Sequence, residues 1–106
     1  MFTEKGTLPI GIEYDGKIHR DFELRPQTVA DSVDAVEEDR ARDNESYLGV
    51  VVLAKQMIKL GDIPREDITT NLLLGMYDVD IAAVNEALGR LRKRLLSFRD
   101  EPKNSA

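Results

Sequence analysis

The sequence predicts an α+β fold: an N-terminal two-stranded antiparallel β-hairpin (residues 7–24) followed by a bundle of three to four α-helices (residues 28–99). Apolar alternation around an Asp-Gly pair indicates the hairpin, while capping residues and helical apolar spacing indicate the helices. The chain has 106 residues, which suits a single domain (residues 1–106) with one modest core. Residues 100–106 are expected to form a flexible tail.

The hairpin can be closed by a loop of two or three residues. A two-residue Asp-Gly loop would place Ile12 opposite His19, whereas a three-residue loop over residues 14–16 places Ile12 opposite Ile18. Opposed residues share a face, so the longer loop gathers the apolar side chains on one side. Gly16 would supply the left-handed position that such a loop requires. We therefore expect the three-residue loop, with His19 facing solvent.

Two helices are expected in the middle of the chain. Thr28 precedes an acidic first turn that includes Asp31, so a surface helix should begin there, with a thin apolar stripe of Val29, Val33 and Val36. Ser46 is expected to cap a core helix over Tyr47–Leu60, which Gly61 would end. Residues 50–53 alone could form a buried strand, but the length of the apolar segment favours a helix.

The last helix carries the strongest periodic pattern. Asp62–Thr70 is expected to be a connector with a short helical turn near Leu72, and Asp78 is the expected N-cap of a helix that Pro102 would close. Apolar residues recur there at alternating spacings of three and four: Ile81, Val84, Leu88, Leu91, Leu95 and Phe98. The pattern spans less than three heptads, so packing on the Tyr47–Leu60 helix is favoured over a coiled coil.

Composition and charge narrow the function class. Apolar residues make up 42% and charged residues 33%, and no apolar stretch is long enough to span a membrane, so a soluble globular protein is expected. The absence of cysteine excludes disulfides and thiolate metal sites and favours the cytoplasm. The net charge of −5 makes nonspecific nucleic-acid binding unfavourable, although basic residues cluster near the end: Arg90, Arg92, Lys93, Arg94 and Arg99.

Catalytic patterns are missing from the sequence. His19 is the only histidine, and a lone histidine on a strand is typical of a surface position rather than of a base or a ligand. The acidic residues 31–45 are spaced as a solvated helix face, and the glycines match neither a phosphate loop nor a dinucleotide fingerprint. We therefore expect no enzyme activity, no catalytic residues, no cofactor and no metal site.

The segment from Thr7 to Asp31, TLPIGIEYDGKIHRDFELRPQTVAD, resembles the opening of the tail assembly chaperones of Mu-like and related contractile-tailed phages and prophages. The family has a leading strand, a D-G turn, a second strand ending in an E-L-R-P-like step and a T-x-x-D helix start, in that order. The later segments LGDIP and ITTNLLLGM are similar to the second half of the family.

This resemblance implies a viral protein that binds the tape measure protein, a long apolar helical chain, and assists assembly with the tail tube components in the host cell cytoplasm. It also implies absence from the mature virion. An amphipathic helix is a common means of holding such a client. We expect Leu88, Leu91, Leu95 and Phe98 to contact either the client or a second copy of the chain. The alternatives are a structural tail component and a small nucleic-acid-binding regulator that uses the basic C-terminal helix.

Overall fold

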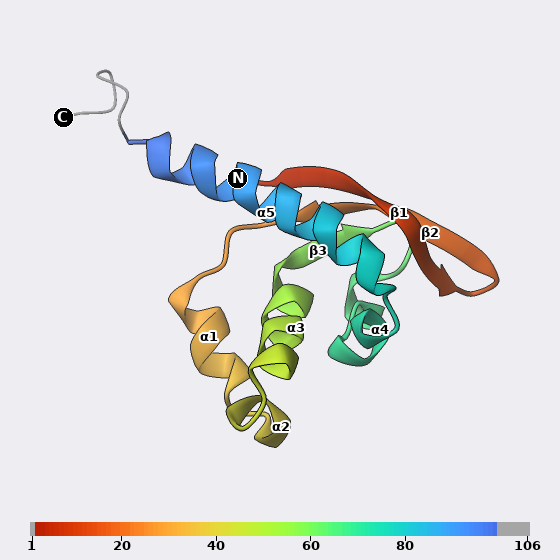
Figure 1. The fold of residues 1–106 in the computed structure, drawn as a ribbon, viewed down its shortest axis with the longest axis horizontal. Coiled ribbons are helices and arrows are strands. Elements are labelled where there is room, and N and C mark those ends of the chain that lie inside the picture. Colours follow the sequence, from red (N-terminus) through yellow and green to blue (C-terminus); the bar gives the residue numbers. More distant parts are fainter. Residues whose placement is uncertain (1, 100–106) are drawn as a thin grey trace.

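The computed structural model describes residues 2–99 and shows an antiparallel sheet of three strands, in the order β1-β2-β3, with helices packed against it (Figure 1). The α+β class is confirmed, but two details of the prediction are wrong: a third strand joins the hairpin, and residues 2–99 contain five α-helices instead of three to four. The elements in chain order are β1 (Glu4–Tyr14), β2 (Lys17–Leu24), α1 (Val29–Ala35), α2 (Asp39–Arg42), α3 (Glu45–Gln56), β3 (Met57–Leu60), a 3₁₀ turn (Arg65–Asp67), α4 (Thr70–Leu74) and α5 (Asp78–Ser97).

The hairpin closes with the two-residue loop, so the predicted three-residue loop is wrong. Tyr14 pairs with Lys17, and Ile12 lies opposite His19. Asp15 and Gly16 have φ values of 52° and 74°, the positive angles that a type I′ turn requires at both central positions. This register places residues on one face differently from the prediction, because β1 is interrupted and not a continuous strand.

A bulge in β1 is what reconciles this loop with the apolar pattern. Thr7 pairs with Asp21 while Ile12 pairs with His19, so β1 advances five residues where β2 advances two. Gly11 adopts a φ of 97° within this bulge. The extra residues change the phase of β1 relative to β2, and Leu8 within the bulge and Ile12 after it are both buried, whereas Ile10 is exposed.

His19 is buried, contrary to the expectation of a solvent-facing side chain. Its Nδ1 atom accepts a hydrogen bond from the Asp62 amide at 3.1 Å, and its Nε2 atom lies 3.2 Å from the carbonyl oxygen of Tyr14. These two partners require a neutral ring that carries its proton on Nε2. The histidine therefore joins the hairpin to the loop after β3.

The predicted Tyr47–Leu60 helix is divided into a helix and a strand. Helix α3 is capped by Asn44, not by Ser46, since the Asn44 side chain accepts a hydrogen bond from the Tyr47 amide at 3.0 Å. The helix ends at Gln56, and Met57–Leu60 pairs with β2 as strand β3. The free edge of β2 needs hydrogen-bond partners, and β3 supplies them. Gly61 (φ 53°) therefore follows a strand and not a helix.

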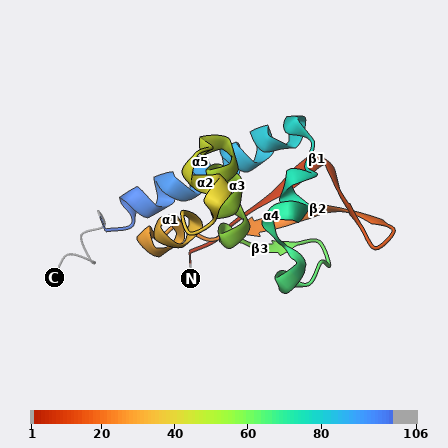
Figure 2. The ribbon, with the colours of Figure 1, turned by 90° about the horizontal axis from the view of Figure 1, so that it is seen from below.

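Helix α5 lies along β1, so the predicted packing on the Tyr47–Leu60 helix is wrong, and α3 and α4 lie below the sheet in the view of Figure 1, as Figure 2 shows from that side. Its Val84, Ala87 and Leu91 side chains join a main core formed with the sheet, α3, α4 and the adjoining loop. A second, smaller cluster joins α1, α2 and α3 through Ala35, Ala41, Tyr47, Val51 and Val52. The predicted flexible tail, residues 100–106, and the predicted helix end at Pro102 lie outside the described residues.

Candidate functional site

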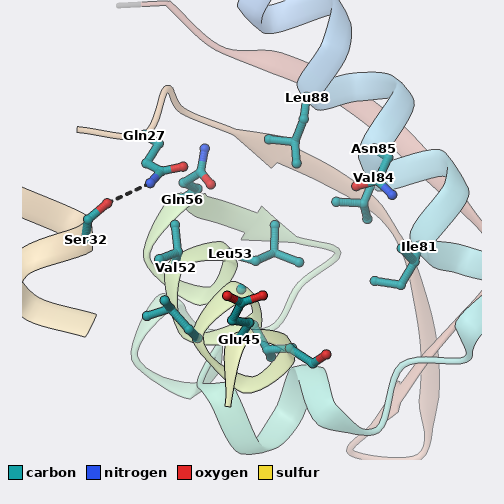
Figure 3. Close-up of a pocket in the computed structure, with 14 residues that line it drawn as sticks. Gln27, Ser32, Glu45, Val52, Leu53, Gln56, Ile81, Val84, Asn85 and Leu88 are labelled. Atoms are coloured by element: carbon teal, nitrogen blue, oxygen red, sulfur yellow. Dashed lines mark hydrogen bonds between the residues drawn. The ribbon is translucent and has the colours of Figure 1, made fainter. Parts of the chain in front are cut away.

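An open groove of about 490 Å³ separates α3 from α5 (Figure 3). Val52 and Leu53 of α3 lie on one side, and Ile81, Val84 and Leu88 of α5 lie on the other. The remaining lining residues are mostly polar and come from the same two helices and from the segment before and in α1: Gln27, Ser32, Glu45, Ser46, Leu48, Gly49, Val50, Gln56 and Asn85. The groove is thus an apolar floor with a polar rim.

The local sequences explain both walls. Helix α3 is apolar on nearly all sides, so Leu53 and Ala54 enter the main core and Val51 and Val52 enter the smaller cluster, while Leu48 and Val50 are only partly buried. Val52 and Leu53 line the groove at the edges of these two clusters. In α5, spacings of three and four place Ile81, Val84 and Leu88 on one face. Because α5 is held along β1, this face is not completely covered by α3.

A second hollow of about 270 Å³ continues the groove toward the C-terminal part of α5. It shares Gln27, Gln56 and Leu88 with the first hollow and adds Pro26 and, further along α5, Leu91, Arg92 and Leu95. The apolar face of α5 is therefore accessible, in part, over several consecutive turns.

The predicted contact residues divide between these hollows and the core. Leu88 lines both hollows, and Leu91 and Leu95 line the second. Leu91 is nevertheless only 2% exposed and belongs to the core, whereas Leu95 is 42% exposed. Phe98 lines neither hollow; its ring packs edge-on against Phe2 at 4.9 Å between centroids. The structure thus brings three of the four predicted residues to one groove.

Polar groups beside the groove are engaged within the protein. Gln27 donates to the Ser32 hydroxyl at 2.8 Å, as Figure 3 shows, and Gln56 donates to the backbone carbonyl of Arg25 at 3.0 Å. Within residues 2–99, no buried side-chain nitrogen or oxygen lacks a hydrogen-bond partner. The groove therefore offers a partner mainly apolar contacts, with side-chain amides and hydroxyls at its edge.

The strongly perturbed titratable groups have structural partners. Two hydrogen bonds of 2.8 Å from Arg25 hold the pKa of Asp31 well below its ordinary range. The hydrogen bond from Tyr14 to Asp67 raises the pKa of the Tyr14 hydroxyl. In both pairs the partners join a strand or strand end to a later segment, which is a sufficient structural reason for the shift.

The described residues contain no cluster of three histidine or carboxylate side chains suited to a metal ion. No helix among them has the length and hydrophobicity needed to cross a membrane. Two of the basic residues near the end of α5 already form salt bridges within the protein. Arg90 and Arg94 both bind Glu4, at 2.9 Å and 2.7 Å.

Sequence reasoning missed the α3 wall of the groove. The excess of apolar residues over the whole circumference of Tyr47–Gln56 was the available signal, since a helix packed on only part of its surface leaves some of them uncovered. It also missed Gln27 and Asn85, for which the sequence carries no signal. Comparison with known proteins found no matching family model, no matching curated protein and no matching solved structure.

Proposed function

We propose that this protein is a non-catalytic binding protein that holds an apolar helical segment of another chain in the groove between α3 and α5. The observation that supports this most is the apolar lining of the open groove, in which Ile81 and Leu88 are partly exposed beside the buried Val52, Leu53 and Val84. Helix-in-groove recognition uses such surfaces, with partner side chains at i, i+3, i+4 and i+7 as anchors.

The size of the site fits this mode of binding. The two hollows follow α5 from Ile81 to Leu95, which is long enough to meet several turns of a partner helix. Each buried leucine-sized side chain contributes about 1.5–3 kcal/mol, so a few anchors can offset the entropy lost on association. The polar rim would accept the charged or amide residues beside the apolar stripe of the partner.

Together with the resemblance of residues 7–31, this groove leads us to propose a phage tail assembly chaperone. Its client is the tape measure protein, whose apolar helical chain has the surface that the groove can cover. The protein would act in the cytoplasm of the host while tail tube components assemble, and it would be absent from the mature virion.

Co-expression with the tape measure protein tests the proposal. The wild-type chain should raise the soluble fraction of the client and co-purify with it. Asn85→Trp and Gly49→Trp place a large ring in the groove from opposite walls and should lower the amount co-purified about tenfold, a loss of about 1.4 kcal/mol. Glu86→Trp is the matched control, because Glu86 is the exposed neighbour of Asn85 and does not line the groove.

Equal co-purification of the Asn85→Trp and Glu86→Trp proteins would show that the groove is not the binding site. The two alternative functions predict other results. A structural tail component would remain in purified particles. A nucleic-acid-binding regulator would bind DNA or RNA through the remaining cations, Arg92, Lys93 and Arg99, with an affinity that falls steeply as salt is added.

A further inference from the structure

Helix α1 presents an apolar stripe to solvent. Val29, Val33 and Val36 are 82%, 57% and 42% exposed, although their spacing places them on one face. The helix is attached through the other face, where Asp31 and Ala35 are buried. The valine stripe therefore contributes nothing to the core of the molecule and is available to a partner.

A second exposed apolar surface lies at the end of α5. Leu95 is 42% exposed and Leu96 is 68% exposed, because this part of the helix extends beyond the main core. Both views show α1 and the C-terminal part of α5 at the same end of the molecule (Figures 1 and 2). A single partner can therefore meet both surfaces.

The charges beside these two surfaces are opposite. Asp34 and Glu37, one turn apart, flank the valine stripe, and Arg92 and Arg99 lie one turn before and after the leucine pair. All four side chains are exposed, and none of them forms a salt bridge within residues 2–99. The acidic residues beside the valine stripe of one copy would therefore attract the basic residues beside the leucine pair of another copy.

We propose that these surfaces join two copies of the chain, with α1 of each copy against the end of α5 of the other. A second copy of the chain is the partner that fits, since each chain carries both the acidic and the basic surface. Twofold symmetry would form the contact twice and close the assembly as a dimer. Most residues that line the groove between α3 and α5 lie outside this contact, and only Arg92 and Leu95, which line its second hollow, belong to both, so this inference goes beyond the proposed client binding.

Charge reversal provides the test, with sedimentation equilibrium as the measurement. The variant Asp34→Arg/Glu37→Arg has two basic surfaces, and the variant Arg92→Glu/Arg99→Glu has two acidic ones. Each variant alone should dimerise at least about tenfold more weakly than the wild type, because like charges face each other in both contacts. An equimolar mixture should restore the dimer, since every contact is then between opposite charges.

The control Glu13→Arg/Glu86→Arg reverses two exposed acids that lie on neither surface, and it should dimerise like the wild type. Circular dichroism establishes that each variant is folded. The proposal is overturned if the wild type stays monomeric at millimolar concentration, if the two variants dimerise as strongly as the wild type, or if their mixture remains monomeric.

Discussion

At the start of α5, the fully buried Asp80 carboxylate accepts hydrogen bonds from the amides of Ile10 and Gly11, both at 2.8 Å. These amides lie in the β1 bulge and have no strand partner, so the carboxylate compensates for a defect in the sheet. The same contact holds the first turn of α5 on β1. One side chain thus fixes the position of the helix that forms a wall of the groove.

We predict that Asp80→Ala lowers the free energy of unfolding by about 3 kcal/mol, because two buried amides lose their charged acceptor. Asp78→Ala is the matched control: Asp78 is exposed in the same helical turn, and its loss should cost about 0.5 kcal/mol. Chemical denaturation followed by circular dichroism measures both. Similar losses for the two variants would refute the role given to Asp80.

Asp31 makes the stability of the protein depend on pH. It completes the capping box of α1 and binds Arg25, and this hydrogen-bonded pairing lowers its pKa from the ordinary value of 3.8. Its stabilising contribution is therefore fully present above pH 3.8 and is lost as the pH falls through the lowered folded-state pKa.

The expected result for Asp31→Asn is a less stable protein at pH 6, whose unfolding free energy falls less steeply than that of the wild type below pH 3.8. Denaturation curves recorded from pH 6 to pH 2 test this. The control Glu86→Gln removes an exposed carboxyl group that lies on neither proposed surface, and it should be as stable as the wild type at pH 6. An unchanged slope in Asp31→Asn would contradict the pairing.

At the scale of whole elements, helical glycines offer a direct comparison. A Cβ at Gly49 in α3 or at Gly89 in α5 would meet no atom within 4 Å, whereas a Cβ at Gly61 would lie 2.3 Å from Nδ1 of His19. Gly49→Ala and Gly89→Ala should each raise the free energy of unfolding by about 0.5–1 kcal/mol.

Gly61→Ala should instead destabilise the protein by about 2 kcal/mol or more, because a positive φ and a close contact both oppose the side chain. Thermal and chemical denaturation of the three variants supply the measurement. Stabilisation by Gly61→Ala would mean that the loop after β3 is not held against His19.

The elements also show how far the sequence could predict the fold. The start of α1 at Thr28 and the presence of α5 were predicted from local signals, namely an N-cap with an acidic first turn and an uninterrupted apolar period. The predicted N-cap of α5 is wrong, because Tyr77 holds that position and Asp78 is the first residue of the helix. The β1 bulge and strand β3 depend on partners distant in sequence: Asp80 for the bulge and the free edge of β2 for the strand. No local pattern carries that information.

The candidate site shows the same limit. The α5 face was predicted because its apolar residues recur regularly, and three of the four predicted residues do meet at the groove. Phe98 does not, because the N-terminal Phe2 contacts its ring. The α3 wall depends on how much of an apolar helix the remaining elements cover, and this is a property of the assembled fold.

On the scale of the whole molecule, two largely separate surfaces are proposed to meet two partners. The groove between α3 and α5 would hold a client helix, and the end formed by α1 and the last turns of α5 would meet a second copy. The charge distribution supports this division on the α1 side, since Asp34 and Glu37 line neither hollow of the groove. Mutations of these two acids should therefore leave client binding largely intact, whereas Arg92 and Leu95 belong to both surfaces.

The most direct test of client binding is an NMR titration of the methyl groups with an apolar amphipathic helix from the tape measure protein. We predict that the Val52, Leu53 and Leu88 methyl signals shift, while those of Ile10 and Ile18, exposed on the hairpin, do not. Groove methyl signals that remain unmoved at a saturating concentration of the helix would contradict the account.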